Sequence, residues 1–262
     1  MTRELINIAL ILEFDGTGFN GWQAQDFGRT VQNEMERAIL AVTGETVRVT
    51  GCSRTDAGVH ASCYVMNFRT ASTIPPDRIK FPLNNVLPAD IRIRESFAVP
   101  PEFHARKHAR AKTYCYRFIN SDTDLAVGRQ YVAQEKGELD FAAIGETLEL
   151  FRGTHDFRAF RSTGSSVQST TRTIYDIRLD RQDRIYTLTV SGDGFLYNMV
   201  RIIAGTLFYV GHGTRTLEDV REALMHGDRL KAGRVAPARG LMLEGVAYDP
   251  QDIGRDGNFH GS

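Results

Sequence analysis

The amino-acid sequence predicts an α+β protein made of two similar halves with mainly antiparallel sheets. Hydrophobic residues alternate with a period of two in some segments and recur every three to four residues in others. The order strand, helix, strand, strand, helix, strand occurs twice along the 262 residues. This repeat favours helices stacked on one face of each sheet, with a cleft between the two halves.

The first half contains four predicted strands and two predicted helices. The strands are residues 6–14, a short stretch at Val47 and Val49, residues 63–69 and residues 91–99. One helix has Val31, Met35 and Ile39 on one face, with Thr30 as its N-cap and Gly44 at its end. The other helix begins at Pro75 and Pro76 and runs through residue 84.

The second half shows the same order. Its predicted strands are residues 113–119, 173–179, 185–190 and 241–246, with a charged turn at residues 181–183. Helices are predicted from Asp140, over residues 195–210, and after a capping box of Thr216 and Asp219. Each half therefore has the order of a ferredoxin-like unit. We expect a first half at residues 1–105, a second at 106–248 and a polar tail at 249–262.

The overall charge gives no indication of a nucleic-acid-binding protein. The chain has 32 Lys and Arg against 32 Asp and Glu, so it has no global basic excess, although a local basic patch is still compatible with this balance. Its start lacks the pattern of a signal peptide, and its longest apolar stretch, residues 195–210, contains Arg201. We expect a cytoplasmic protein without a membrane partner.

The cysteines are Cys52, Cys63 and Cys115, and they form no CxxC pair. Together with His60 they lack the close ligand pairs of a zinc site. We expect reduced thiols that pack as small hydrophobic side chains.

The first candidate site is the loop at residues 51–60, which lies between two predicted strands. A carboxylate there, Asp56, can act as nucleophile or base, and Arg54 is close enough in sequence to hold an anionic substrate. The alternative is that Asp56 caps a turn and Arg54 is a solvated surface charge.

The second candidate is the segment at residues 103–118, which holds five Lys or Arg residues and no acid. Basic side chains can follow a phosphate backbone, and a tyrosine ring can stack on an unpaired base. Tyr114, Tyr116 and Phe118 share one strand face, and at least two of them are expected in the core.

The third candidate is Arg201, the sole charge in a helical stretch that is apolar on most faces. A helix of this kind is buried, and a buried guanidinium needs a carboxylate or a substrate phosphate as its partner. The alternative is that Arg201 reaches solvent along its own stem.

Two other patterns fit less well. Residues 8–17 are similar to the opening of a haloacid-dehalogenase phosphatase, but Glu13 stands where the aspartyl nucleophile belongs, and no second acidic pair for magnesium follows. A phosphatase would depend on Asp15 and magnesium. The element order also suggests an RNA-recognition motif, whose Gly-aromatic strand signature is absent from the sequence.

The chain closely resembles the bacterial tRNA pseudouridine synthase A family. Residues 54–61 read Arg-Thr-Asp-Ala-Gly-Val-His-Ala, which is the most specific of the matching strings. Weaker matches cover nearly the whole chain: residues 14–17, 21–25, 29–32, 87–91, 103–106, 112–116, 155–157, 194–201 and 236–237 before Gly240.

This resemblance implies an enzyme that isomerises uridines at positions 38 to 40 of the tRNA anticodon stem-loop. It implies Asp56 as the single essential aspartate and Tyr114 as the ring that packs on the target base. Arg201 would pair with the aspartate, and Arg54 would help to displace the target nucleotide. It also implies the pseudouridine synthase fold around a basic cleft and a homodimer that needs no metal or cofactor.

Three positions depart from the family pattern: Phe14, Ser53 and Tyr64 stand where tyrosine, glycine and glutamine are frequent. None of them replaces a site residue. The alternative from another class is a non-catalytic tRNA-binding or RNA-chaperone protein, in which Asp56 is dispensable. Whether Asp56 attacks the sugar, adds to the uracil ring or removes a sugar proton is not determined by the sequence.

Overall fold

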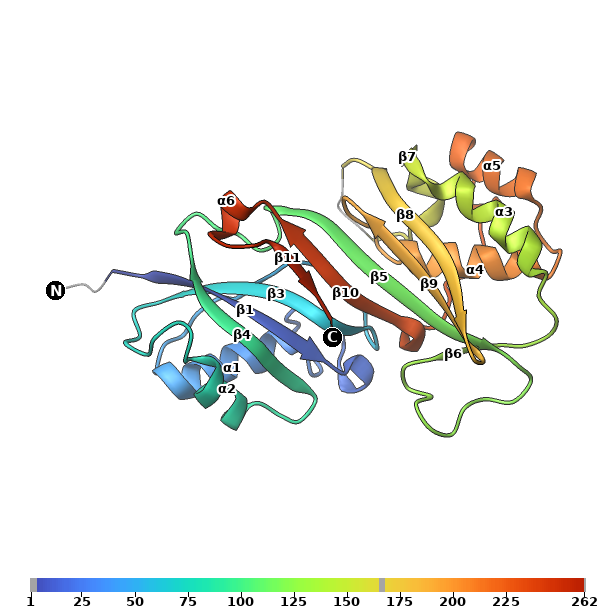
Figure 1. Cartoon of the computed structure of the whole chain (residues 1–262). Coiled ribbons are helices and arrows are strands. Elements are labelled where there is room, and N and C mark those ends of the chain that lie inside the picture. Colours follow the sequence, from blue (N-terminus) through green and yellow to red (C-terminus); the bar gives the residue numbers. More distant parts are fainter. Residues whose placement is uncertain (1–3, 165–167, 262) are drawn as a thin grey trace. The chain divides into compact units, whose positions relative to one another are not determined.

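A computed structural model describes residues 4–164 and 168–261, which fold into two compact units (Figure 1). The first unit contains the residues up to Arg110 together with those from Leu243 onward, and the second contains Ala111–Met242. The sequence places these boundaries at residues 105 and 248. The later boundary moves because strand β10, Leu241–Tyr248, adjoins β3 of the first unit from Leu243 on.

The sheet of the first unit has the strand order β4-β1-β3-β10, and β2 also pairs with β3. The bounds are Ile6–Phe14 for β1, Thr50–Gly51 for β2, His60–Thr70 for β3 and Ile91–Val99 for β4. β3 runs antiparallel to β1 and β2, and β4 runs antiparallel to β1. This is the strand arrangement of a ferredoxin-like unit, as the sequence predicts.

The strand expected at Val47 and Val49 is wrong, because β2 is confined to Thr50–Gly51. The backbone N–H of Val49 donates to the Glu36 carboxylate at 3.2 Å instead of joining a strand ladder.

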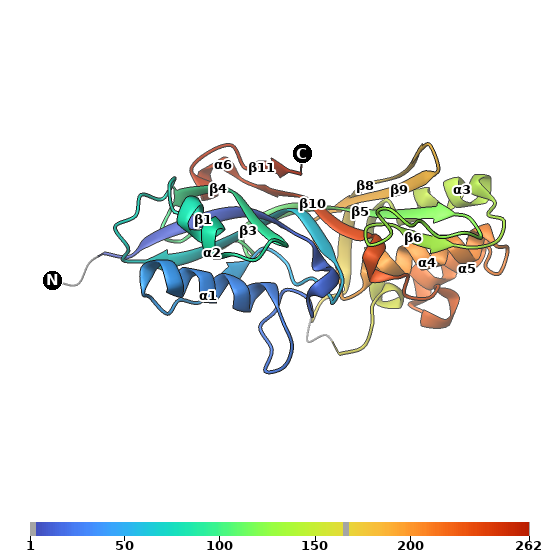
Figure 2. The same ribbon diagram turned by 90° about the horizontal axis from the view of Figure 1, so that it is seen from below.

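Helices α1, Val31–Thr43, and α2, Lys80–Val86, lie on the same face of this sheet (Figure 2). The caps of α1 are confirmed: the Thr30 side chain accepts from the Asn33 N–H, and Gly44 is left-handed. The second helix starts later than predicted. The chain after Pro75 first makes a turn, in which the N–H groups of Arg78 and Ile79 donate to the Pro75 carbonyl.

The second unit contains the strand order β5-β9-β8-β7 in antiparallel pairs. Its strands are β5 Ala109–Asn120, β6 Ala133–Glu135, β7 Gly153–Asp156, β8 Thr171–Gln182 and β9 Ile185–Gly192. The short strands β6 and β7 are not predicted by the sequence. β8 and β9 are joined by the expected charged turn, where Asp183 has φ +54°.

Helix α3, Phe141–Phe151, contacts both α4, Met199–Gly211, and α5, Leu217–His226. Asp140 caps α3, and the capping box of Thr216 and Asp219 is confirmed at the start of α5. α4 is almost wholly buried, as its composition predicts. It begins at Met199 and not at residue 195, because Asn198 adopts φ +61°, which a continuous right-handed helix does not accommodate.

The residues expected to form a polar tail are instead part of the first unit. Asp249 precedes the short helix α6, Pro250–Ile253, and strand β11, Asn258–His260, pairs antiparallel with β10. Phe259 is buried and packs against Phe97 and Tyr248. One aromatic side chain thus anchors a segment whose composition is otherwise polar.

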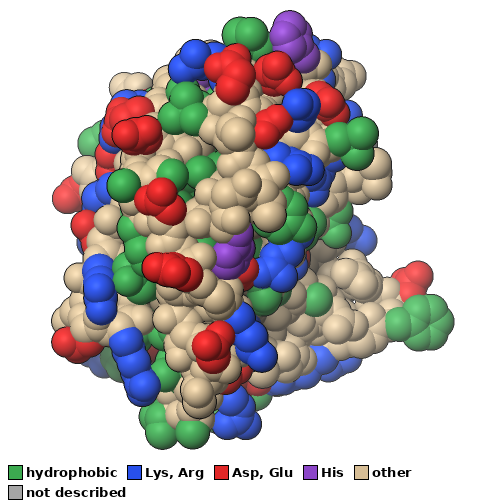
Figure 3. All heavy atoms as spheres, turned by 90° about the vertical axis from the view of Figure 1, so that its right-hand side faces the viewer, with side chains coloured by type: hydrophobic (Ala, Val, Ile, Leu, Met, Phe, Trp, Pro, Cys, Tyr) green, Lys and Arg blue, Asp and Glu red, His purple; other side chains and the backbone are tan. Residues whose placement is uncertain are grey.

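The structure confirms the α+β class with mainly antiparallel strands. Across residues 4–164 and 168–261, the helices are too short or too polar to cross a bilayer. On the face seen in Figure 3, Lys and Arg side chains are mixed with Asp and Glu side chains, which is the pattern of a solvated surface.

Candidate active site

The loop at residues 52–59 joins β2 to β3 and carries Asp56. The Val59 N–H donates to the Asp56 carbonyl at 3.1 Å, which closes a four-residue turn with Gly58 at φ +78°. Asp56 is half-buried, Arg54 is exposed and Thr55 between them is buried. A tight turn therefore holds the half-buried carboxylate at the end of the strands, where solvent can reach it.

The segment before α1 holds this loop from one side. The Trp22 N–H donates to the Thr55 carbonyl at 3.1 Å, and the Gly58 N–H donates to the Phe19 carbonyl at 3.2 Å. Gly21 has φ +85°, and a Cβ added there would lie 2.3 Å from the Thr55 carbonyl oxygen. Only glycine allows this close approach, so the turn before α1 and the Asp56 loop form one packed assembly.

His60 begins β3 and connects the loop to the turn η1, Gly16–Gly18. Its ring is buried, and its Nδ1 accepts from the Gly16 N–H at 3.0 Å. Asp15 Oδ1 lies 3.2 Å from the same nitrogen and also accepts from the N–H and the hydroxyl of Thr17. Because Asp15 caps this turn, its contacts favour a structural role over the role that a phosphatase would require of it.

Tyr114 lies on β5 of the second unit. Its ring is buried and meets Phe195 edge to face, with ring centroids 5.2 Å apart. Tyr116 and Phe118, on the same strand face, pack against Phe208 of α4. The expectation that at least two of the three rings belong to the core is therefore confirmed.

Arg201 lies in the first turn of α4 and is half-buried. Its Nε donates to the Ala236 carbonyl at 2.7 Å, and its Nη1 donates to Asn198 Oδ1 at 2.8 Å. These two bonds fix the guanidinium within the second unit. The left-handed Asn198 thus both ends the preceding turn and orients the arginine.

The structure brings Arg54 and Asp56 together on one loop of the first unit. It places Tyr114 and Arg201 on β5 and α4 of the second unit. Sequence reasoning missed the residues that hold them. The glycines of residues 16–21 are a visible signal for close packing, whereas nothing local in the sequence singles out Asn198 as a support for Arg201.

The basic segment at residues 103–118 is only partly engaged in ion pairs. Arg110 forms ion pairs with Asp249 and Asp252, while Arg106 and Lys107 are exposed. His104 Nδ1 accepts from the N–H groups of Arg106 and Lys107 at 3.2 and 3.3 Å. Desolvation by burial, and then the charge of Lys107, lower the pKa of His104 below its usual value. The ring is thereby kept neutral, as an accepting nitrogen requires.

The cysteines are buried thiols that form no disulfide with one another, and burial raises the pKa of Cys63 to about 12. A thiol with so high a pKa is protonated and packs as an apolar side chain. In the part of the chain that the structure describes, no cluster of three or more His, Cys, Asp or Glu side chains is arranged to hold a metal ion.

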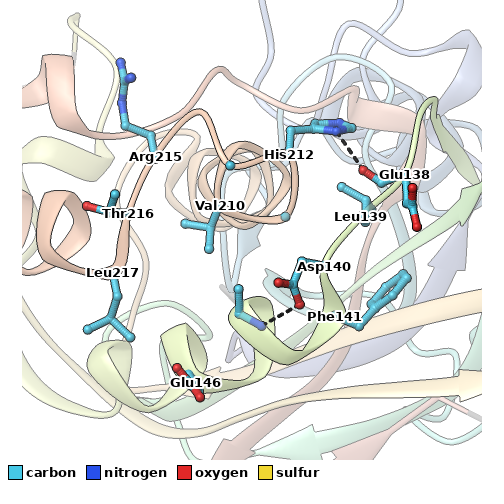
Figure 4. A pocket seen from close by; sticks show the side chains of 13 residues that line it. Glu138, Leu139, Asp140, Phe141, Glu146, Val210, His212, Arg215, Thr216 and Leu217 are labelled. Atoms are coloured by element: carbon cyan, nitrogen blue, oxygen red, sulfur yellow. Dashed lines mark hydrogen bonds between the residues drawn. The ribbon is translucent and has the colours of Figure 1, made fainter.

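A hollow of about 760 Å³ in the second unit lies between α3, α4 and α5 (Figure 4). Asp140 lines it but caps α3, and Thr216 lines it but belongs to the capping box of α5. His212 Nδ1 donates to the Glu138 carbonyl at 3.1 Å. These polar groups are used by the helix ends, and none of the sequence-predicted site residues lines the hollow.

Comparison with known proteins identifies the class. The family model described as tRNA pseudouridine synthase matches residues 10–106 and 148–249, which include both the Asp56 loop and Arg201. Because this match covers most of the chain, the protein belongs to the tRNA pseudouridine synthase family. The resemblance found in the sequence is thus confirmed, and the fold is the pseudouridine synthase fold.

Individual relatives extend this match. The chain is 48% identical to tRNA pseudouridine synthase A of Acetivibrio thermocellus over 242 residues, covering 92% of this chain and 99% of the relative. The same identity and coverage hold for tRNA pseudouridine synthase A of Clostridium acetobutylicum. Among solved structures, a chain in the crystal structure of a Cbf5-Nop10-Gar1 complex aligns with a TM-score of 0.38 and 11% sequence identity. The alignment covers 94% of this chain and 59% of that chain.

Proposed function

We propose that this protein is an isomerase that converts uridine to pseudouridine in the anticodon stem-loop of tRNA, at positions 38 to 40. Asp56 is its essential carboxylate. The observation that carries the proposal is the Asp56 loop, a specific family string held by backbone hydrogen bonds in a half-exposed turn. Relatives named tRNA pseudouridine synthase A, of nearly the same length, support tRNA as the substrate.

The reaction breaks the bond between N1 of uracil and C1′ of the ribose and forms a bond between C5 and C1′. The C5 proton leaves to solvent, and N1 gains a proton. Atoms and electrons balance within one nucleotide, so no redox partner enters. We propose that the enzyme works without a metal or cofactor, which an assay in chelator tests.

The target base has to leave the helical stack before it can react. Extruding a base costs a few kcal/mol, and contacts to the phosphate backbone with stacking on an aromatic ring can offset this cost. We assign the stacking ring to Tyr114, whose position is fixed by Phe195. Arg54, exposed on the Asp56 loop, is assigned to displace the nucleotide.

Asp56 has to be ionised whether it attacks the sugar, adds to the ring or removes a sugar proton. We propose that Arg201 pairs with it, because an adjacent guanidinium favours the charged carboxylate. The two bonds from Arg201 to Ala236 and Asn198 hold the guanidinium in one orientation, which supports this role. We further propose that the protein works in the cytoplasm as a homodimer. Sedimentation of the purified protein with and without tRNA tests the dimer.

The test is release of tritium from uridine labelled at C5 in unmodified tRNA transcripts, with chelator present. We expect the wild type to release tritium from transcripts with uridine at positions 38, 39 or 40, and to release none when cytidine replaces them. Binding of tRNA without release would identify a non-catalytic RNA-binding protein instead. Release that persists after the cytidine replacements would show a different target site.

A further inference from the structure

Tyr64 lies on β3 directly beneath the Asp56 loop. Its side chain is fully buried, and its hydroxyl donates a hydrogen bond to the backbone carbonyl of Ser53. Ser53 immediately precedes Arg54, so the acceptor lies three residues before Asp56. A buried hydroxyl that finds such an acceptor compensates for its own desolvation and fixes the group it binds.

The packing around the ring leaves the hydroxyl little freedom. Tyr64 stacks on Trp22, with ring centroids 4.2 Å apart and planes 25° from parallel, and it also contacts Phe14 at 5.5 Å. At Gly51, an added Cβ would lie 2.1 Å from the Tyr64 hydroxyl and 2.5 Å from the Trp22 ring. The tyrosine oxygen is therefore confined by aromatic rings on one side and by backbone on the other.

Two backbone carbonyls on either side of Arg54 are held in this way. Tyr64 donates to the carbonyl of Ser53, and the Trp22 N–H donates to the carbonyl of Thr55 at 3.1 Å. Tyr64 and Trp22 are themselves stacked. The loop segment before Asp56 is thus held at alternate residues by the Tyr64 hydroxyl and the Trp22 backbone N–H.

We propose that Tyr64 is a positioning residue for Asp56, acting through its hydroxyl bond to Ser53. This inference rests on the proposed function, in which Asp56 is the reacting carboxylate. A displacement of about 1 Å in a reacting group can cost about 10²-fold in rate. Loss of the hydroxyl should therefore lower the rate of the chemical step. It should leave the affinity for tRNA and the folded fraction nearly unchanged.

The test compares Tyr64→Phe with Tyr248→Phe. Tyr248 is a matched control because it is buried in the same unit and its hydroxyl donates at 2.7 Å to the carbonyl of Ala105, which is not a residue of the Asp56 loop. Each change removes one buried hydroxyl and keeps the ring. We expect kcat to fall roughly tenfold in Tyr64→Phe, with KM for tRNA within about twofold of wild type. In Tyr248→Phe, kcat should stay at the wild-type value.

Two further readouts keep a folding defect separate from a positioning defect. Far-UV circular dichroism gives the folded fraction, because the fluorescence of Trp22 would respond to any change in the Tyr64 ring that it stacks on, and kcat is expressed per folded enzyme. Amide hydrogen exchange at residues 53–56 should become faster in Tyr64→Phe than in Tyr248→Phe.

Equal kcat in the two folded variants would overturn the inference, and so would unchanged exchange at residues 53–56. A wild-type enzyme that releases no tritium would instead overturn the proposed function, because neither variant then has a rate to compare. The two failures are therefore distinguishable in one experiment.

Discussion

The two units differ in the connection that joins β2 to β3 in the first unit and β8 to β9 in the second. In the second unit, the long strand β8 turns directly into β9 through Asp183 and Arg184. In the first unit, β2 shrinks to Thr50–Gly51, and residues 52–59 form the loop that carries Asp56. The same scaffold thus makes a plain hairpin in one unit and, in the other, the loop to which we assign the chemistry.

The difference between the β2–β3 loop and the β8–β9 hairpin lies in the connections and not in the strands that they join. The strand ladders of both units are regular, and they fix the ends of each connection without determining what the connection does. The loop of the first unit is held by bonds other than those of the ladder, from the Trp22 backbone N–H and the Tyr64 side-chain hydroxyl. The hairpin of the second unit needs no such support, because a two-residue turn is held by its flanking strands.

The largest expected effect on this comparison comes from Gly21→Ala. The new Cβ would overlap the Thr55 carbonyl, and the residue has φ +85°. Gly128→Ala in the second unit is the matched control, since Gly128 has φ +77° with open space around it. We expect a loss of about 1–2 kcal/mol in unfolding free energy for Gly128→Ala, from backbone strain alone. Gly21→Ala should lose roughly 3 kcal/mol and most of the tritium-release activity.

Urea unfolding of both variants, with activity measured on the folded protein, checks this prediction. Equal losses for the two alanine variants would mean that the contact between Gly21 and the Asp56 loop contributes nothing to stability.

A smaller and equal effect is expected at the first helix of each unit. Thr30 caps α1 through one backbone N–H, and Asp140 caps α3 through two. Thr30→Ala and Asp140→Ala should each lower the unfolding free energy by about 1 kcal/mol. Neither should change kcat for folded enzyme, because both caps belong to the shared scaffold. A fall in kcat for only one of them would place that cap in the site.

The smallest effect is confined to the second unit and to acid pH. A hydrogen bond from Lys231, followed by one from the Thr216 N–H, lowers the pKa of Asp219 to about 2. Because the folded state lowers this pKa, the carboxylate stabilises the fold above about pH 4 and loses that contribution as pH falls toward 2. Lys231 is partly exposed to solvent, which screens the pair, so the contribution is small.

This contribution is measured by comparing the unfolding free energies of wild type and Asp219→Asn between pH 6 and pH 2. The difference between the two proteins should shrink as the pH falls. A difference that is constant over this range would show that the charge of Asp219 does not matter.

Local chemistry made much of the fold predictable. The caps at Thr30, Asp140 and Thr216 depend on residues within one helical turn, so the sequence displays them directly. β2 was misplaced because Val49 is engaged by Glu36, a partner thirteen positions away. β11 was missed because Phe259 finds its place only against Phe97 and Tyr248.

The residues of the candidate site likewise divide into those that the sequence predicts and those that it does not. Asp56 and Arg54 could be proposed from a loop motif, because a short string of unusual composition contains both. The support from Tyr64 could not, since its hydroxyl reaches Ser53 only through the register of β3 beside β2. Arg201 was singled out by its apolar helix, but its bonds to Asn198 and Ala236 depend on the left-handed turn before α4.

The most direct test of the difference between the two connections is tritium release by Asp56→Asn beside Asp183→Asn. Both changes remove one carboxylate from the turn between corresponding strands, and Asn tolerates the φ of +54° at position 183. We predict that Asp56→Asn lowers the rate by at least about 10³-fold while tRNA binding persists, and that Asp183→Asn keeps the wild-type rate. Turnover by Asp56→Asn within tenfold of wild type would contradict the assignment of the chemistry to the first unit's loop.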